Sequence, residues 1–167
     1  MERTINKIWI ILFEGFCMLL AINLFFIPSL YYSNLSELIP VHYSIKGIPD
    51  SYGHKSTLFL LAAIGFVIYL VLLLIGTLDG NRYNIPFKAS PKERKRIVKH
   101  VQFVFRMLRF NLLVIFNGAI TGIILIAMGY MKAFGSITFF IILLLIVLPV
   151  VYLFARMKKN TFKVNGV

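Results

Sequence analysis

The sequence is poor in acidic residues and in cysteine. Only six of its 167 residues are Asp or Glu, against 18 Lys and Arg. So few carboxylates leave few pairs for acid–base catalysis. The sequence also has no HExxH, no P-loop, no G-x-S-x-G and no glycine-rich dinucleotide turn. The single cysteine, Cys17, cannot form a disulfide within the chain. We therefore predict a protein that is not an enzyme and that needs no cofactor.

Long apolar runs make up most of the rest of the chain. The composition is 59% hydrophobic, with a mean hydropathy of +0.85, whereas soluble domains lie nearer half apolar. A helix that crosses a membrane needs about 20 apolar residues. Four runs meet this length: residues 8–30, 57–78, 108–129 and 136–154. The sequence therefore predicts an all-α integral membrane protein, a single membrane domain over 1–167 with four transmembrane helices.

The basic residues predict the orientation of these helices. The net charge of +12 would suggest a nucleic-acid partner in a soluble protein, but here the charges lie at the ends of apolar runs. Fifteen of the 18 Lys and Arg fall in the N-terminus, the 79–109 stretch and the C-terminal tail. By the positive-inside rule these segments are cytoplasmic, and the 31–56 connection faces outward. We expect a multi-pass protein of the cell membrane, with both termini in the cytoplasm and no nucleic-acid partner.

The cytoplasmic segment 79–107 contains a strong signal for the start of a helix. In Ser90-Pro91-Lys92-Glu93, serine caps the helix, proline takes its first position and Glu93 completes a capping box. Apolar residues then recur every three or four positions, and most basic residues fall on the opposite side. This pattern predicts a basic amphipathic helix that lies along the membrane surface, bound to anionic lipids, before the chain turns into the third span.

The outward connection, 31–56, carries the most distinctive motif. Residues 41–46 alternate in polarity and are compatible with a short extended segment. Tight turns are indicated at four positions that follow it: Gly47, Pro49, Asp50 and Gly53.

This connection contains four motif elements in order. A proline is followed two residues later by a histidine, and then come a Gly-x-Pro-Asp turn and a lysine beside the next span. These residues are Pro40, His42, Gly47, Pro49, Asp50 and Lys55. The pattern, over about residues 15–60, resembles the uncharacterised N-terminal domain of SdpI-type bacterial immunity proteins. A looser match continues through the basic helix. The resemblance implies protection against a secreted, membrane-active toxic peptide, or sensing of that peptide.

The same loop has a structural interpretation. Pro and Gly fix turns, and Asp50 can bond turn amides or cap the next helix. The alternative is a recognition site for a ligand or peptide, formed by His42, Gly47, Pro49, Asp50 and Lys55. A metal is a third and weaker interpretation: His42, Asp50 and His54 have suitable donors, but their spacing matches no standard site. We predict no metal.

Polar residues inside the apolar runs are the remaining candidates. Glu14 is a carboxylate within a span, which makes it a functional hypothesis by default. It can instead reach the inner interface and pair with Lys7 or Arg109. Gly118 and Gly122 form a GxxxG pair that permits close packing, either within the chain or in a homo-oligomer. The amides that share this setting are Asn23, Asn111 and Asn117.

Three functions remain open. The first is sensing of, or immunity to, an extracellular peptide or envelope stress. The second is a small channel, or an accessory subunit of a transporter, with a path lined by Glu14 and the three asparagines. Either of these allows another membrane protein as partner. The third is a metal-dependent membrane enzyme, which needs an ion with an open coordination position.

Overall fold

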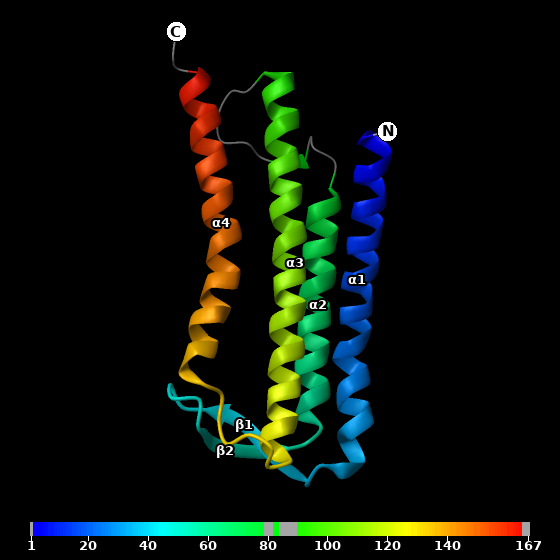
Figure 1. The fold of residues 1–167 in the computed structure, drawn as a ribbon, viewed down its shortest axis with the longest axis vertical. Coiled ribbons are helices and arrows are strands. Elements are labelled where there is room, and N and C mark those ends of the chain that lie inside the picture. The colour runs from blue at the N-terminus through cyan, green and yellow to red at the C-terminus, as the bar shows by residue number, and fades with distance from the viewer. Residues whose placement is uncertain (1, 79–81, 84–89, 165–167) are drawn as a thin grey trace.

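The fold, seen in a computed structural model, consists of four long helices and one β-hairpin (Figure 1). The structure describes residues 2–78, 82–83 and 90–164, so part of the basic segment 79–107 lies outside the described residues. The helices are α1 (Glu2–Tyr31), α2 (Thr57–Thr77), α3 (Pro91–Ala127) and α4 (Ser136–Val164). A short 3₁₀ turn, η1 (Tyr32–Asn34), leads to β1 (Leu38–Tyr43) and β2 (Pro49–His54).

The helices form an up-and-down bundle organised around α3. Helix α3 packs against each of the other three helices, and α1 also packs against α2. Both ends of the chain lie at one end of the bundle, and the hairpin lies at the other (Figure 1). The three basic residues predicted to face outward, Lys46, Lys55 and Lys132, all belong to the hairpin end.

Three helices, α1, α2 and α3, are long and apolar enough to cross a membrane. Helix α4 has a shorter apolar stretch, Phe140–Arg156. Large hydrophobic side chains cover the outside of the bundle, among them Trp9 (67% exposed) and Leu74 (67% exposed). Soluble proteins rarely expose so much contiguous apolar surface. The chain is therefore a helical, multi-pass membrane protein.

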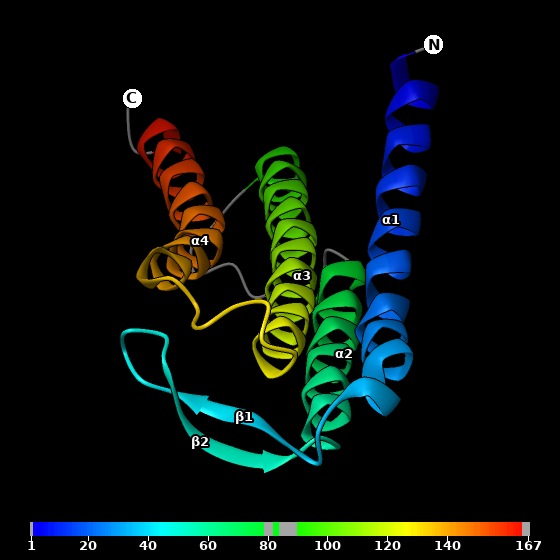
Figure 2. The ribbon, with the colours of Figure 1, turned by 60° about the horizontal axis from the view of Figure 1, so that its bottom comes forward.

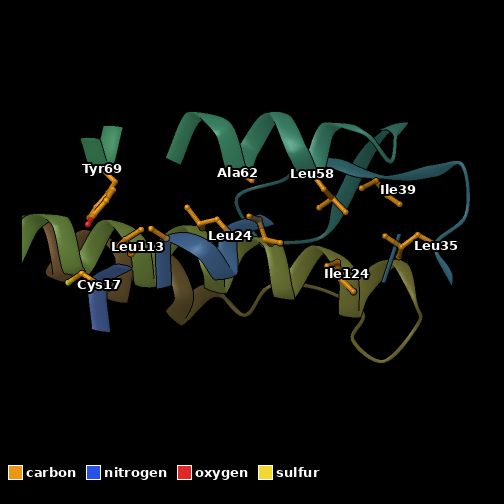
Figure 3. Packing of buried hydrophobic residues seen from close by; sticks show 11 residues of the cluster. Cys17, Leu24, Leu35, Ile39, Leu58, Ala62, Tyr69, Leu113 and Ile124 are labelled. Carbon is orange, nitrogen blue, oxygen red and sulfur yellow. The ribbon is translucent and has the colours of Figure 1, made fainter. Parts of the chain in front are cut away.

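The core lies where α1, α2 and α3 meet and continues under the hairpin (Figure 3). Small residues allow the helices to approach closely, as expected in a membrane bundle. A side chain at Gly65 of α2 would collide with the ring of Phe116 of α3, since its Cβ would lie 2.6 Å from that ring. The buried cluster includes Cys17, Leu24, Leu58, Leu113, Ile120 and Ile124.

The connection between α1 and α2 is a hairpin, so the all-α prediction is wrong for this segment. Strands β1 and β2 pair antiparallel, from Leu38 opposite His54 to Tyr43 opposite Pro49, with irregular register around His42. Of the four predicted turn residues, only Gly47 lies in the turn. The other three belong to β2. The apolar and β-branched residues of 38–43 favour a strand, and β2 pairs with it through its backbone.

The basic helix starts where the sequence predicts, but it does not form a separate segment before the third span. The capping box at Ser90 and Glu93 is confirmed: the Ser90 hydroxyl accepts a bond from the Glu93 amide, and the Glu93 carboxylate accepts one from the Ser90 amide. The helix, however, does not turn before the third span, because α3 runs unbroken from Pro91 to Ala127, about 55 Å at 1.5 Å per residue. No proline or glycine interrupts it before Gly118, so nothing in the sequence supplies a kink.

Candidate functional site

The hairpin is closed by a short turn that depends on glycine. The Gly47 amide donates to the Ser44 carbonyl (2.8 Å), and the Ser44 amide donates to the Ile48 carbonyl (2.9 Å). Gly47 has a φ of +75°, a conformation that disfavours a Cβ atom. Pro49 opens β2, a position where its missing amide hydrogen costs no ladder bond. The turn thus places the hairpin tip at a defined point.

That tip contacts the segment that joins α3 to α4 (Figure 2). The Phe134 amide donates to the Gly47 carbonyl (2.9 Å). The Phe134 ring meets the ring of Tyr43 edge to face, with 4.8 Å between centroids. The same ring lies against Gly122 of α3, where a Cβ would come within 2.2 Å of it. Phe134 therefore ties the hairpin to the start of α4.

An ionic cluster holds the base of the hairpin. The Glu37 carboxylate forms two ion pairs: Oε1 lies 3.1 Å from Lys55 Nζ, and Oε2 lies 3.1 Å from His54 Nε2. Lys55 also donates to the Leu35 carbonyl (3.3 Å) and lies 4.7 Å from the centre of the Tyr32 ring. The hydrogen bond and charge of Lys55, followed by the charge of His54, lower the pKa of Glu37. Lys55 thus joins the end of the hairpin to η1 and to the residues that lead from η1 into β1.

The exposed part of the hairpin carries a second charged pair. His42 Nδ1 lies 2.5 Å from Asp50 Oδ1, and their side chains are 70% and 44% exposed. Two apolar side chains near this pair in the sequence are also exposed: Ile45 is 90% exposed and Ile48 is 52% exposed. The tip therefore offers both a polar pair and an apolar surface to a partner.

The three weak metal candidates are not brought together. His42 and Asp50 form their pair towards the tip, whereas His54 lies opposite Leu38 at the other end of the strands. Among the residues that the structure describes, no three His, Cys, Asp or Glu side chains form a group that could hold a metal. The hairpin therefore offers no metal centre in this arrangement.

Two further features of the hairpin were not apparent from the sequence. An apolar pocket of about 250 Å³ lies between β1 and α2, lined by residues that include Ile39, Val41, Leu58 and Ile64. The Tyr43 hydroxyl is buried and has no hydrogen-bond partner among the described residues. Its burial, with a smaller contribution from Tyr52, raises the pKa of Tyr43 to about 12.

Glu14 occupies a second charged site, at the far end of the bundle from the hairpin. One of its oxygens, Oε1, accepts from Arg109 Nη2 (2.7 Å) and from Arg106 Nε (3.0 Å). Arg109 is only 3% exposed. Sequence reasoning named Arg109 as a possible partner of Glu14 but missed Arg106. The available signal was the spacing: residues three apart share one face of a helix.

The asparagines form bonds within the bundle. Asn23 of α1 donates to Asn117 of α3 (2.8 Å), and Asn117 donates to the carbonyls of Leu20 (3.0 Å) and Leu113 (2.8 Å). Asn111 donates to the Leu145 carbonyl of α4 (2.6 Å). These amides join helices in pairs: Asn23 and Asn117 join α1 to α3, and Asn111 joins α3 to α4.

The two glycines of the GxxxG pair have different surroundings. Gly122 receives the Phe134 ring, as described above, whereas a Cβ at Gly118 would have nothing within 4 Å. Of these two glycines, Gly122 mediates a close contact among the described residues and Gly118 does not.

One family model matches part of the chain. Residues 18–66 match a family described as a domain of unknown function (DUF1648). The match begins within α1, includes the whole hairpin and ends within α2. No curated protein and no solved structure gives a significant match. The hairpin is thus the central feature of the matched domain, and the resemblance to immunity proteins stays a prediction.

Proposed function

We propose that this protein is a sensor of the cell membrane, in which the outward hairpin binds an extracellular peptide and passes that event to α4. The observation that carries the proposal is the Phe134 contact. The hairpin belongs to the α1–α2 half of the chain, yet its tip is bonded to Phe134, in the short segment that leads into α4. A ligand that moves the tip therefore acts directly on the other half of the bundle.

The proposed topology has four spans, with both termini and the Glu14 end of the bundle in the cytoplasm. Its support is the distribution of basic residues, which favours the termini and the start of α3 as the inner side. Helix α4 is 29 residues long, enough to cross at about 1.5 Å per residue. Its outer surface exposes Phe140, Leu143 and Leu148, among others, at more than half of their area. Lipid is the environment that suits such a surface.

Helix α4 is suited to respond, because few contacts hold it. It packs mainly on α3. The bond from Asn111 to Leu145 anchors its middle, and Tyr152 contacts Phe103 (centroids 5.6 Å apart) and His100 (6.0 Å) near its cytoplasmic end. A shift transmitted through Phe134 therefore travels along the interface between α4 and α3, where these side chains make the named contacts among the described residues.

The ligand class follows from the surface of the hairpin and from the resemblance. The exposed tip combines the His42–Asp50 pair with the apolar side chains of Ile45 and Ile48. A membrane-active peptide presents the matching combination of polar and apolar groups. Immunity to such a peptide, or signalling of its presence, is the biological role that we propose.

The test is a survival assay on cells that produce the protein and are challenged with secreted toxic peptides. We expect wild-type protein to protect, and His42→Ala and Asp50→Ala to lose protection at matched membrane levels. Lys132→Ala is the matched control, because it removes a charge at the same end of the bundle but outside the hairpin. Protection by both hairpin variants at normal levels contradicts recognition by this pair. Absence of protection by the wild type contradicts the immunity role.

A further inference from the structure

Strand β2 forms an edge of the hairpin that another strand can join. In the part of the chain that the structure describes, the sheet has two strands, and β2 pairs with β1 alone. Strand β1 packs against α3, whereas β2 lies at the rim of the hairpin (Figure 2). Four of the six residues of β2 are exposed, and Tyr52 at its middle is 60% exposed. An exposed edge of this kind is a template for pairing with another chain.

The register of the hairpin decides which backbone groups point outward. The Lys55 amide donates to the Glu37 carbonyl (2.9 Å), so these two residues form a hydrogen-bonded pair at the base of the ladder. Such pairs alternate with non-hydrogen-bonded pairs in an antiparallel ladder. The pair of Pro40 and Tyr52 is therefore non-hydrogen-bonded, and the Tyr52 amide and carbonyl point away from β1. The free edge of β1 is less suited to pairing, because Pro40 has no amide hydrogen to offer there.

The charges along β2 complement a second copy of the same strand. Asp50 lies two residues before Tyr52 and His54 lies two residues after it, with side chains 44% and 56% exposed. In an antiparallel pair of β2 strands centred on Tyr52, Asp50 of each copy lies opposite His54 of the other. His54 and Lys55 share the single carboxylate of Glu37. With His54 protonated, the base of the hairpin carries a net positive charge, which the carboxylate of Asp50 offsets.

We propose that two copies of this chain pair through their β2 edges and form one four-stranded antiparallel sheet. A two-fold axis along the membrane normal relates the copies and passes beside Tyr52. The Tyr52 amide of each copy donates to the Tyr52 carbonyl of the other, and the two rings face each other. The hairpin lies at one end of the bundle, so two copies inserted in the same direction bring their edges to one level (Figure 1). The pairing depends neither on peptide binding nor on which side of the membrane the hairpin faces.

Cysteine crosslinking of the full chain, in membranes of the cells that produce it, tests this register. Residues opposite each other in a hydrogen-bonded pair have Cα atoms about 5.5 Å apart, a distance that a disulfide can span. We expect Tyr52→Cys to give a covalent dimer on mild oxidation. Asp50→Cys alone and His54→Cys alone should give none, because each lies about 14 Å along the strand from the same residue of the other copy. Production of these two chains together should restore the dimer. The natural Cys17 is fully buried and sets the background.

Further variants separate strand pairing from chance collision. Tyr52→Pro removes the outward amide hydrogen and should abolish the crosslink between the Asp50→Cys and His54→Cys chains. Tyr52→Ala keeps that amide and should keep the crosslink, and hydrogen exchange in residues 44–47 checks that the hairpin persists in both.

Ile45→Cys is the collision control, because Ile45 is 90% exposed but lies outside both strands. Three results would overturn the proposal. The first is a dimer yield at Ile45→Cys equal to that at Tyr52→Cys, and the second is no dimer at Tyr52→Cys. The third is a crosslinked product whose mass is not twice 19.2 kDa, which would identify a different partner at this edge.

Discussion

The backbone amide of Phe134 donates a hydrogen bond to the carbonyl of Gly47, 2.9 Å away, although 86 residues of the chain separate the two. This bond joins the tip of the hairpin to the segment that precedes α4 (Figure 2). Two properties of glycine permit it. Gly47 adopts a φ of +75°, and a Cβ there would lie 1.8 Å from the Phe134 carbonyl oxygen. Any other residue must move the hairpin away from Phe134.

Gly47→Ala should therefore release the hairpin tip. The left-handed conformation alone costs about 1–2 kcal/mol, and the clash with Phe134 adds to this cost. We expect faster hydrogen exchange in residues 44–54, measured by mass spectrometry, and a lower melting temperature. Gly129→Ala is the matched control, because Gly129 has a similar φ of +80° but nothing within 4 Å of its Cβ position. If both variants leave hairpin exchange unchanged, the contact does not hold the tip.

Gly122 and Gly118 provide a second matched pair. Gly122→Ala places a Cβ against the Phe134 ring, whereas Gly118→Ala adds a methyl group in open space. Overpacking of a close contact typically costs about 1–3 kcal/mol, so Gly122→Ala should lower the melting temperature. Gly118→Ala should leave it unchanged or raise it, since alanine favours the helix. An effect of Gly118→Ala as large as that of Gly122→Ala would instead indicate that Gly118 contacts a second copy of the chain.

These glycines show what the sequence could and could not predict. The apolar runs predicted α2 almost to the residue, and the Ser90–Glu93 capping box predicted the first turn of α3, because both signals are local. The partners of Gly47 and Gly122 could not be predicted. Phe134 is far from Gly47 in the sequence, lies beyond the end of α3 from Gly122, and resembles any other interfacial aromatic residue. The second strand of the hairpin could not be predicted for the same reason. The residues of β2 have little strand propensity of their own, and β2 depends on pairing with β1.

The Glu14 site was partly predictable. A carboxylate inside an apolar run needs a partner, and basic residues at the start of the third run were the candidates. Arg106 and Arg109 both reach Glu14 because α3 continues as one helix past the position of Glu14. The basic amphipathic pattern predicts a bend at this level, and such a bend would turn Arg106 away from α1.

Tyr43→Phe should leave stability unchanged or increase it. The Tyr43 hydroxyl is buried without a partner among the described residues, and an unsatisfied buried group costs about 1–3 kcal/mol. Phenylalanine removes this group and keeps the ring contact with Phe134. Tyr43→Ala, which loses the ring as well, should lower the melting temperature. A loss of stability in Tyr43→Phe would show that the hydroxyl has a partner, such as a bound water.

The pKa of Glu37 should depend mainly on Lys55. Lys55 lowers this pKa from its ordinary value of 4.5, and His54 makes a smaller contribution. Because the folded state lowers the pKa, the ionised carboxylate stabilises the hairpin above pH 4.5. This contribution is lost as the pH falls through the folded pKa. A carbon NMR titration of the Glu37 carboxyl should show a larger upward shift in Lys55→Met than in His54→Gln. The opposite order would mean that His54 is the dominant partner.

Glu14→Gln should be more damaging than loss of one arginine. The change leaves Arg109, 3% exposed, without its carboxylate, and removal of one partner of a buried ion pair costs about 3–5 kcal/mol. Arg106→Gln should cost less, because Glu14 keeps its 2.7 Å bond to Arg109. The measurement is the free energy of unfolding in detergent for each variant.

The double variant Glu14→Gln/Arg109→Leu separates an unpaired charge from lost packing. If the cost of Glu14→Gln arises from the buried guanidinium, removal of that guanidinium should recover part of the stability, and the two changes should be far from additive. Additive losses would mean that Arg109 finds another anion when Glu14 is removed. Addition of anionic lipid to the Glu14→Gln protein then distinguishes the two cases, because a lipid phosphate that replaces the carboxylate should raise the melting temperature of this variant more than that of the wild type.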